Sequence, residues 1–596
     1  MLNAGIHVRS FWRADSAAFF RKFEGQLSSA SSRIADRLLV TRLVAGRGAV
    51  FGLRLLRLPL RLISGFGTQT PERLLIAPQD IRTTDPTIAS DIYSGYFVFA
   101  GKSVNTHGQS PFEILPPSDA WFIGLTNFTW LRHLRAADSA LARANARALV
   151  GDWINLRGRP SNAPDWNADV VARRLLSFLS QSPLILDGAD RDFYRRFMRS
   201  LGVHSKYLQR CLSDGLEGES RLLCAIAVAE LGLCAQGLNT IAKRGTKMLV
   251  DELKAQILPD GGHIGRNPQI LVDLLLDLLP LRQAYAARGT SAPQMLLNAI
   301  DRMMPMLRLF RHSEGSMALF NGMGPTAAHA VATVLAYDDA RAAPLLHAPH
   351  SGYERIEAGE TIIIMDCGTP PPARFSCEAH AGTLSFEMSN GANRIFVNCG
   401  VPLNPRADLR EVARTTAAHT ALIVGDTSSA RFATGAGLDR WVAGQVIAGP
   451  TDVRTRRAQD EYAVEIEARH DGYDRSFGLL HERRLTLSAD GLRFEGEDKL
   501  IATGRRVPGA GQAEFALRFH LHPMVRPERV EGGAAVVLTL PDASRWLFGA
   551  SGLPVAVEES IFLGGREGPR QTDQLVVSAK VRETPALVWT MERLAD

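Results

Sequence analysis

The sequence predicts a multidomain α+β protein, in which a long series of helices precedes an antiparallel β-sandwich. Three observations support this prediction. The chain has 596 residues, more than a single hydrophobic core organises. From about residue 115 to about residue 345, apolar residues recur at the three-to-four-residue spacing of helices. After about residue 350 they alternate with polar residues, as they do in strands.

The first part of the chain contains several stretches with helical spacing. The expected helices cover 121–153, 170–179, 193–212, 220–235, 241–258, 270–288 and 292–310. Gly, Pro, Asp and Asn occupy the short connections, so consecutive helices should run antiparallel to each other. The spacing alone fits a bundle, a solenoid or a closed toroid.

The last 250 or so residues contain short alternating segments bounded by turn residues. The expected strands are 361–366, 383–388, 394–398, 463–468, 484–487, 492–496, 515–522 and 535–540. Short strands with turns at fairly regular spacing are typical of antiparallel sheets packed as a sandwich.

Composition restricts function only weakly. The formal net charge of +6 is compatible with a polyanionic partner but is spread over a large surface. The six cysteines include no CxxC pair and no zinc-knuckle spacing, so we expect buried free thiols. The cysteines leave the redox compartment open.

The first 65 residues are rich in arginine and leucine and poor in acidic residues. Arg54, Arg57 and Arg61 interrupt the apolar run 50–63 at helical spacing, which argues against a membrane-spanning helix and a cleavable signal peptide. Two interpretations remain. The segment is an amphipathic helix on an anionic membrane surface, or it packs on its own domain with a solvated basic face.

No Walker loop, dinucleotide fingerprint, HExxH or nucleophile elbow occurs in the sequence. The candidates for chemistry are polar residues that interrupt the strand and helix patterns. They lie in the segments 376–387, 414–421, 470–484 and 258–268. A single histidine on a strand is more often structural than catalytic, and several together change that balance only modestly.

In combination, these segments resemble the heparinase II/III-like polysaccharide lyases over roughly residues 75–590. The matching segments are His380 to Phe386, Arg414 to His419, Gly472 to Arg483, Ser560 to Gly565, Trp166 with Arg173 and Arg174, and Gln256 to Gly262. The resemblance implies an α/α toroid (a helical barrel) followed by a β-sandwich. The expected domains are a basic N-terminal segment at 1–70, the toroid at 71–348 and the sandwich at 349–596.

The resemblance also implies an activity, the cleavage of an acidic, glycosaminoglycan-like glycan by β-elimination. Such a site must neutralise a uronate carboxylate, remove a weakly acidic proton and protonate the leaving oxygen. The expected catalytic residues are His380, Tyr473 and His263. The expected substrate-binding residues are Arg266, Glu219, Asn267 and His419. We expect no metal, no cofactor and no nucleic-acid partner.

The sequence departs from the family pattern at several positions. The helix start that commonly carries an Asn reads Glu217-Gly218-Glu219, and Ile270 stands where the family has its catalytic Tyr. Gly382 and Asn398 replace the aspartates that follow the sandwich histidine. With those aspartates missing, His419 alone does not make a metal site.

Three functions therefore remain open: a lyase with a rebuilt site, a hydrolase that uses Glu219 with another carboxylate, or a non-catalytic polysaccharide-binding or envelope-assembly protein. The family implies the bacterial cell envelope, in the periplasm. No clear signal peptide is visible, so a cytoplasmic or membrane-peripheral location is the alternative.

Overall fold

The structure is a computed structural model of the chain. It describes residues 37–38, 40–46, 48, 52, 69–338, 341–403, 407–433, 441–505, 507, 513–530 and 532–595. Nearly all of the predicted segment 1–70 lies outside these residues, so its contact with a membrane surface stays a prediction. Among the helices that the structure describes, none is long and apolar enough to cross a bilayer.

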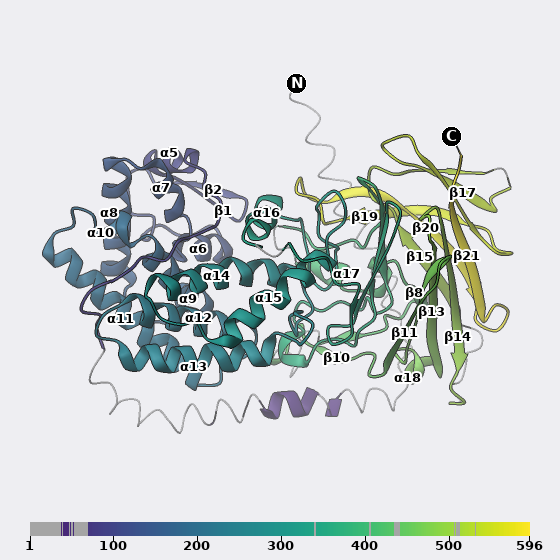
Figure 1. Ribbon diagram of the computed structural model, residues 1–596, viewed down its shortest axis with the longest axis horizontal. Helices are drawn as coiled ribbons and strands as arrows, with labels where there is room; N and C mark the ends of the chain where they lie inside the picture. Colours follow the sequence, from purple (N-terminus) through teal and green to yellow (C-terminus); the bar gives the residue numbers. More distant parts are fainter. Residues whose placement is uncertain are drawn as a thin grey trace.

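The chain has a helical half followed by a half made of antiparallel sheets, as predicted, and Figure 1 shows the two halves at opposite ends of the long axis. The helices do not close into a barrel over the described residues. They are α5 (Thr87–Tyr93), α6 (Asp119–Thr126), α7 (Leu131–Ala137), α8 (Ala140–Arg157), α9 (Ala168–Ser180), α10 (Ser182–Leu186), α11 (Arg191–Ser213), α12 (Glu219–Cys234), α13 (Asn239–Gln256), α14 (Pro268–Ala287), α15 (Gln294–Leu309) and α16 (Ala328–Ala336). A small hairpin of β1 (Tyr96–Phe99) and β2 (Lys102–Asn105) precedes α6.

A five-stranded sheet follows the helices. Its order is β3 (His347–Ala348), β4 (Tyr353–Ala358), β5 (Thr361–Asp366), β6 (Phe386–Asn390) and β7 (Asn393–Phe396). After the short helix α17 (Ala407–Ala413) come β8 (Leu422–Val424) and a two-stranded sheet of β9 (Arg431–Phe432) and β10 (Val446–Ala448).

Two further antiparallel sheets, of eight and four strands, complete the chain. The eight-stranded sheet has the order β11 (Val453–Gln459), β12 (Ala463–His470), β13 (Leu479–Ser488), β14 (Arg493–Ala502), β21 (Ala586–Arg593), β18 (Arg545–Ala550), β17 (Ala535–Thr539) and β16 (Arg526–Arg529). The four-stranded sheet has the order β19 (Ala556–Phe562), β20 (Arg570–Lys580), β15 (Glu514–His520) and β8. The four-residue helix α18 (Asp474–Phe477) connects β12 to β13.

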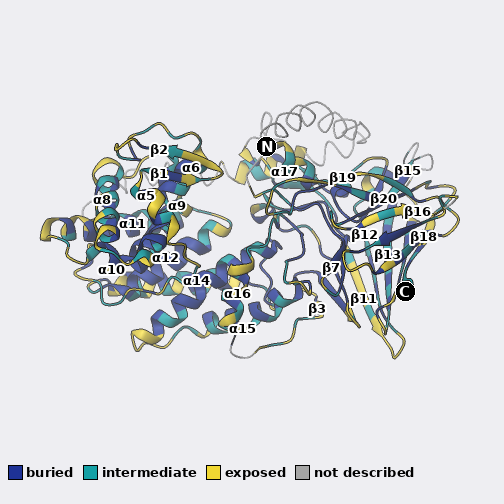
Figure 2. Cartoon of the chain, turned by 90° about the horizontal axis from the view of Figure 1, so that it is seen from above, coloured by how far each residue is buried: buried dark blue, intermediate teal, exposed yellow. Residues whose placement is uncertain are grey.

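The sheets share one apolar core. Side chains of β12 and β13 alternate between buried and partly exposed, which is the period of two expected for strands with one covered face. Phe386 of β6 stacks on Trp589 of β21 with ring centroids 5.8 Å apart. Figure 2 shows the buried residues concentrated inside the helical half and along the strands.

A second apolar cluster connects the two halves. It contains residues of α14 and α15 together with Tyr353, Ile362 and Ile364 of β4 and β5. Burial of such side chains contributes roughly 1.5–3 kcal/mol each. The helices are therefore held against the five-stranded sheet by a continuous core.

The loop 258–267 between α13 and α14 stabilises the contact between the helices and the five-stranded sheet. Asp260 Oδ2 accepts hydrogen bonds from the backbone N–H groups of His350 and Ser351 at 2.8 and 2.7 Å, and its Oδ1 accepts from Ser351 Oγ at 2.6 Å. A Cβ on Gly261 would lie 2.0 Å from a backbone oxygen, and one on Gly262 would lie 1.9 Å from Ser351 Oγ. The two glycines are thus required for the close approach of the loop to its neighbours.

Candidate functional site

Most of the residues predicted to carry chemistry gather where the helical half meets the five-stranded sheet. Three segments meet there: the loop 258–267, the loop 321–324 and the segment 376–385 before β6. A Cβ on Gly322 would lie 3.1 Å from Asn267 Nδ2 and 2.9 Å from Glu378 Cβ, so the three segments are in contact. We call this region the domain joint.

His380 and His419 form a hydrogen-bonded pair at the domain joint, and the backbone sets the position of its protons. His419 Nδ1 lies 2.7 Å from the carbonyl oxygen of Thr415, which can only accept, so this nitrogen carries the proton. His419 Nε2 then accepts from the Nδ1–H of His380 at 3.1 Å. His380 Nε2 keeps its lone pair, and no described residue forms a hydrogen bond with it.

Both imidazoles are neutral near pH 7. Burial lowers the pKa of His419 to about 4. Burial, with His419 and Arg414 nearby, lowers the pKa of His380 well below its ordinary value. His380 Nε2 can accept a hydrogen bond or a proton, but the imidazolium form would need an anion beside it.

Asn321 connects His380 to a buried ion pair. Its side-chain oxygen accepts from the backbone N–H of His380 at 3.0 Å, and its Nδ2 donates to Tyr353 Oη at 2.8 Å and to Asp366 Oδ2 at 3.3 Å. Asn321 has a φ of 46°, a left-handed conformation that Asn tolerates better than most residues. Sequence reasoning singled out none of Asn321, Tyr353 and Asp366. The sequence feature that marks the position of Asn321 is the Gly-Met-Gly-Pro loop that follows it.

Arg266 is bound by the sheet half. Its Nη2 lies 2.6 Å from Asp366 Oδ1. Its Nε, Nη1 and Nη2 donate to the carbonyl oxygens of Ser351, Thr369 and Gly352 at 2.7, 3.0 and 3.0 Å. These bonds use four of the five guanidinium N–H groups. The geometry therefore gives no support to the prediction that Arg266 binds a substrate carboxylate.

Both ring nitrogens of His263 also form hydrogen bonds within the protein. Its Nδ1 accepts from the backbone N–H of Gly265 at 3.0 Å, so its Nε2–H donates to Gln256 Oε1 at 3.1 Å. Burial lowers the pKa of His263 to about 3. With both ring nitrogens bonded, His263 orients the loop, and its predicted catalytic role finds no support in this geometry.

Glu219 begins α12 beside the domain joint. Its Oε1 would lie 3.5 Å from a Cβ on Gly265, which places the carboxylate next to the loop of His263. Glu219 is an exposed residue, yet the protein around it, together with Glu378 and Asp273, raises its pKa to about 7. Near neutral pH, Glu219 therefore adds partial negative charge here.

Asn267 caps α14. Its side-chain oxygen accepts from the backbone N–H of Gln269 at 2.9 Å, and its Nδ2 is directed toward the loop 321–324. Ile270, one turn further along, is buried in the core shared by the two halves. No tyrosine therefore projects from this part of α14.

Tyr473 is the predicted site residue that the structure does not bring to the domain joint. Its side chain is fully buried in the core between the sheets, with its ring 5.5 Å from that of His470. Its hydroxyl donates to the carbonyl oxygen of Leu422 at 2.7 Å. This position supports a packing role for Tyr473 and gives no support to catalysis.

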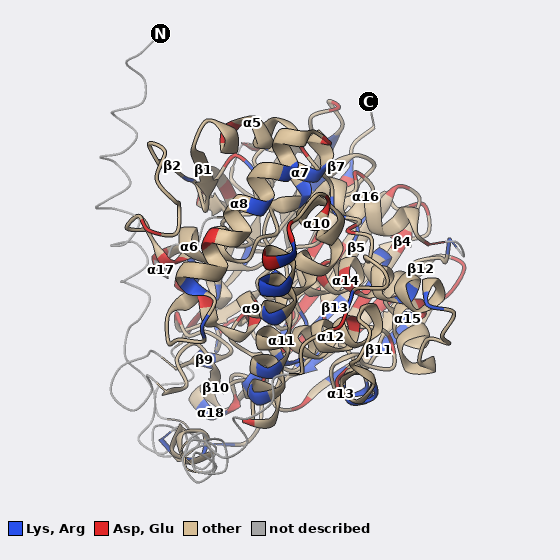
Figure 3. Cartoon of the chain, turned by 90° about the vertical axis from the view of Figure 1, so that its left-hand side faces the viewer, with Lys and Arg blue, Asp and Glu red and all other residues tan. Residues whose placement is uncertain are grey.

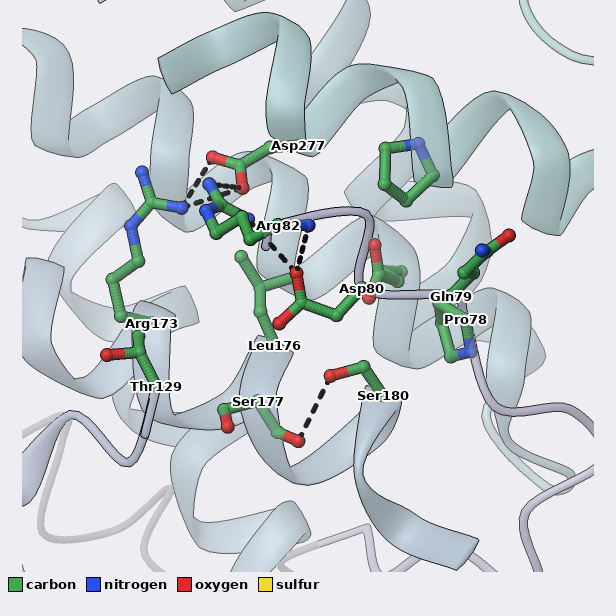
Figure 4. Close-up of a pocket in the computed structure, with 12 residues that line it drawn as sticks. Pro78, Gln79, Asp80, Arg82, Thr129, Arg173, Leu176, Ser177, Ser180 and Asp277 are labelled. Atoms are coloured by element: carbon green, nitrogen blue, oxygen red, sulfur yellow. Dashed lines mark hydrogen bonds and ion pairs between the residues drawn. The ribbon is translucent and has the colours of Figure 1, made fainter. Parts of the chain in front are cut away.

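A small recess in the helical half lies between the segment 78–82 and helices α9, α12 and α14. Arg82 and Arg173 converge there on Asp277, each within 2.7 Å, as Figure 4 shows. Glu230 also lines the recess, and burial with Asp277 and Asp80 raises its pKa to about 8. The two arginines fasten the segment before α5 and the middle of α9 to α14.

Within the residues that the structure describes, no three His, Cys, Asp or Glu side chains are grouped so that they could hold a metal ion. The six cysteines form no disulfide. Burial raises the pKa of the Cys399 thiol to about 12, so this thiol is not a nucleophile near neutral pH.

Comparison with known sequences identifies the family. The sequence pattern described as "Heparinase II/III-like, C-terminal" matches residues 340–590. FtsZ-localized protein C from Caulobacter vibrioides (strain NA1000 / CB15N) is 31% identical over 534 residues, which cover 86% of this chain and 88% of that protein. The chain belongs to the heparinase II/III-like family.

Solved structures show the same fold. Heparinase III matches with a TM-score of 0.65 and 14% identity, covering 83% of this chain and 80% of that one. The heparan sulfate lyase HepC from Pedobacter heparinus matches with a TM-score of 0.60 and 16% identity, covering 87% and 84%. At this identity the likeness describes the fold only.

This heparinase II/III-like chain thus shares the fold of the lyases of known structure. His380 and His419 lie together at the domain joint, while Ile270 and Glu219 occupy positions where the family resemblance leads one to expect Tyr and Asn. The domain joint consequently combines a neutral histidine pair with a carboxylate of raised pKa.

Proposed function

We propose that this chain is a non-catalytic member of its family that works in cell division, in association with FtsZ. The observation that carries the proposal is the composition of the domain joint. β-Elimination requires a cation or several donors on the uronate carboxylate. Among the predicted substrate-binding residues, the arginine, Arg266, is bound by the sheet, and Glu219 brings negative charge instead.

The neighbouring charges support the same conclusion. Glu378 lies in the domain joint and pairs with Arg410, whose Nη2 is 2.5 Å from Glu378 Oε1. That pair is neutral overall, so it provides no excess positive charge for a polyanion. A uronate entering the joint would meet Glu219 without a compensating residue from the predicted set.

The similarity to FtsZ-localized protein C supports the cellular role. That relative is 31% identical to this chain over most of both lengths, whereas heparinase III and HepC are 14% and 16% identical to it. The shared fold then serves as a scaffold whose surfaces bind division proteins, and the domain joint keeps the two halves in a fixed arrangement.

Co-sedimentation tests this proposal. The purified full-length chain is mixed with FtsZ from the same organism that has been polymerised with GTP. After centrifugation, the pellets are compared with those from samples in which FtsZ is mixed with GDP. We expect the chain to pellet only with polymers. Recovery in the supernatant at all FtsZ concentrations would overturn the association.

A second candidate function is polysaccharide cleavage, and one observation favours it. His380 Nε2 is an unoccupied acceptor, oriented by His419, next to the domain joint. The exposed Arg374, stacked over Phe375 beside His263, would be the cation available to a uronate. An ultraviolet assay for unsaturated uronate, run on a panel of acidic polysaccharides, tests this candidate: absorbance that rises with wild type and not with His380→Ala would establish it.

A further inference from the structure

Helix α11 carries an unusual concentration of positive charge on its solvent side. Its 23 residues include six basic residues, Arg191, Arg195, Arg196, Arg199, Lys206 and Arg210, and one acidic residue, Asp192. Figure 3 shows Lys and Arg, in blue, along α11, on the side of the helical half that faces the viewer in that view. We call Arg191, Arg195, Arg196, Arg199, Lys206 and Arg210 the basic stripe, which extends over about 29 Å of the helix axis.

The opposite side of α11 is firmly packed, so the basic stripe has a fixed orientation. Phe193, Phe197, Leu201, Leu208 and Leu212 are buried in the core of the helical half. Asp190 caps the helix by accepting from two backbone N–H groups at 2.7 and 2.8 Å. A partner would therefore meet a preformed row of cations.

Most arginines of the basic stripe have no ion pair. Arg195 lies 4.0 Å from Asp192 with both side chains more than half exposed, and no ion pair within 4.0 Å joins Arg191, Arg196 or Arg199 to another described residue. The pKa of Asp190 is lowered by the backbone N–H of Phe193 and, to a lesser extent, by the charge of Arg196. The outer face of the eight-stranded sheet is different. There Arg484 contacts Glu467 at 2.8 Å and Glu497 at 3.5 Å across neighbouring strands. Arg484 is thus balanced by carboxylates on neighbouring strands, whereas Arg191, Arg196 and Arg199 of α11 have no such arrangement among the described residues.

The position of the arginines lowers the stability of α11. Arg191 lies in its first turn, at the positive end of the helix dipole, where acidic residues are favoured, whereas Arg210 in the last turn is favourably placed. Arg191, Arg195 and Arg199 are also spaced four residues apart, so each like-charged pair costs about 0.2–0.5 kcal/mol.

The chemistry of the basic stripe favours a carboxylate-bearing partner. Arginine binds carboxylates bidentately, and five of the six residues are arginines. Side chains one helical turn apart are about 6 Å apart, close to the roughly 7 Å between alternate residues of an extended chain. No large apolar side chain of α11 is exposed, which disfavours insertion into a bilayer.

We propose that the basic stripe of α11 docks an acidic, extended segment of a partner protein. This docking requires no activity at the domain joint. The basic stripe would bind any partner protein that carries such an acidic, extended segment. The docking will weaken as salt is added, because exposed charges are screened within about 10 Å at 0.1 M ionic strength.

Fluorescence anisotropy of a labelled twelve-residue peptide of alternating Glu and Ser tests the proposal on the full chain. The triple variant Arg195→Gln, Arg196→Gln, Arg199→Gln removes three charges from the basic stripe. The matched control Lys243→Gln, Arg244→Gln, Lys247→Gln removes three exposed charges from α13. Circular dichroism and thermal melting confirm that both variants are folded.

We expect wild type and the α13 variant to bind the peptide with Kd values within twofold, and the α11 variant to bind at least tenfold more weakly. Absence of binding by wild type would overturn the proposal, as would equal losses in the two variants, which would indicate net charge alone. A third measurement uses vesicles of phosphatidylglycerol and phosphatidylcholine. Vesicle flotation that depends on α11, without peptide binding, would assign the basic stripe to a membrane surface and also overturn it.

Discussion

His380 Nδ1 donates to His419 Nε2 at 3.1 Å, and this one contact sets the protonation of both rings, because His419 Nδ1 is already bonded to a carbonyl oxygen. A histidine with a free, oriented Nε2 is what a general base requires. Among the residues predicted for substrate binding, the cation Arg266 is used to hold the two halves together.

The tautomers of this pair can be measured. We expect both rings to be neutral at pH 7, each with its proton on Nδ1. Nitrogen-15 NMR of the full chain with labelled histidine, assigned through His380→Gln and His419→Gln, reports which nitrogens are protonated. An imidazolium at either position at pH 7 would contradict the hydrogen-bond assignment.

The pKa of His419 predicts a loss of stability in acid. Its folded pKa is about 4, below the ordinary value of about 6.5, so the folded protein binds fewer protons than the unfolded chain between these values. The stabilisation is complete above pH 6.5 and declines as the pH falls toward 4, by roughly 3 kcal/mol for a shift of this size.

Urea unfolding of wild type and His419→Gln at pH 7, 6, 5 and 4 measures this contribution. We expect the free energy of unfolding of wild type to fall more steeply with acid than that of the variant, which does not titrate at this position. Parallel curves for the two proteins would show that His419 titrates normally.

The Arg266–Asp366 pair predicts a large effect on stability. Removing one partner leaves the other as an uncompensated buried charge, so Arg266→Met should lower the free energy of unfolding by about 3–5 kcal/mol. Arg266→Lys should recover little of this, because an ammonium cannot reproduce the bonds to three carbonyl oxygens. Chemical denaturation measures both variants, and a change below 1 kcal/mol in Arg266→Met would contradict the role assigned to Arg266.

Tyr473 provides a contrasting prediction. Tyr473→Phe removes the hydroxyl that donates to the Leu422 carbonyl and should cost about 1–3 kcal/mol, because that buried acceptor loses its partner. Co-sedimentation with FtsZ polymers should be unchanged. A variant of normal stability with altered FtsZ binding would show that Tyr473 acts in recognition.

The fold could be predicted from local patterns to a useful extent. The predicted strand 361–366 coincides with β5, and the predicted helix 193–212 lies within α11. The predicted helix 121–153 was too long, since the structure divides it into α6, α7 and α8. Asp138 ends α7 in a left-handed conformation with φ of 38°, which apolar spacing does not reveal.

The start of β6 shows the same limitation. A strand was predicted over 383–388, but β6 begins at Phe386, because Leu384 has a φ of 66° and Ser385 N–H donates to the Gly382 carbonyl oxygen in a turn. The alternating pattern of the segment is compatible with both conformations. Hydrogen bonds within the turn decide between them.

The sequence predicts which segments form the candidate site better than it predicts what each residue does there. His380, His419, Glu219, His263, Arg266 and Asn267 do lie in or beside the domain joint. The roles of Arg266 and His263 depend on partners such as Ser351 and Asp366, the latter 100 residues from Arg266 along the chain, and local spacing carries no information about them. Asn321 was overlooked because its function arises only from contacts with His380, Tyr353 and Asp366.

We propose that this heparinase-like scaffold does not perform β-elimination. The most direct test is the ultraviolet assay for unsaturated uronate on heparin, heparan sulfate, chondroitin sulfate, alginate and hyaluronan, with heparinase III as the positive control and His380→Ala as the negative control. We expect wild type and His380→Ala to give the same flat trace on every polysaccharide. A rise in absorbance with wild type that His380→Ala abolishes would contradict it.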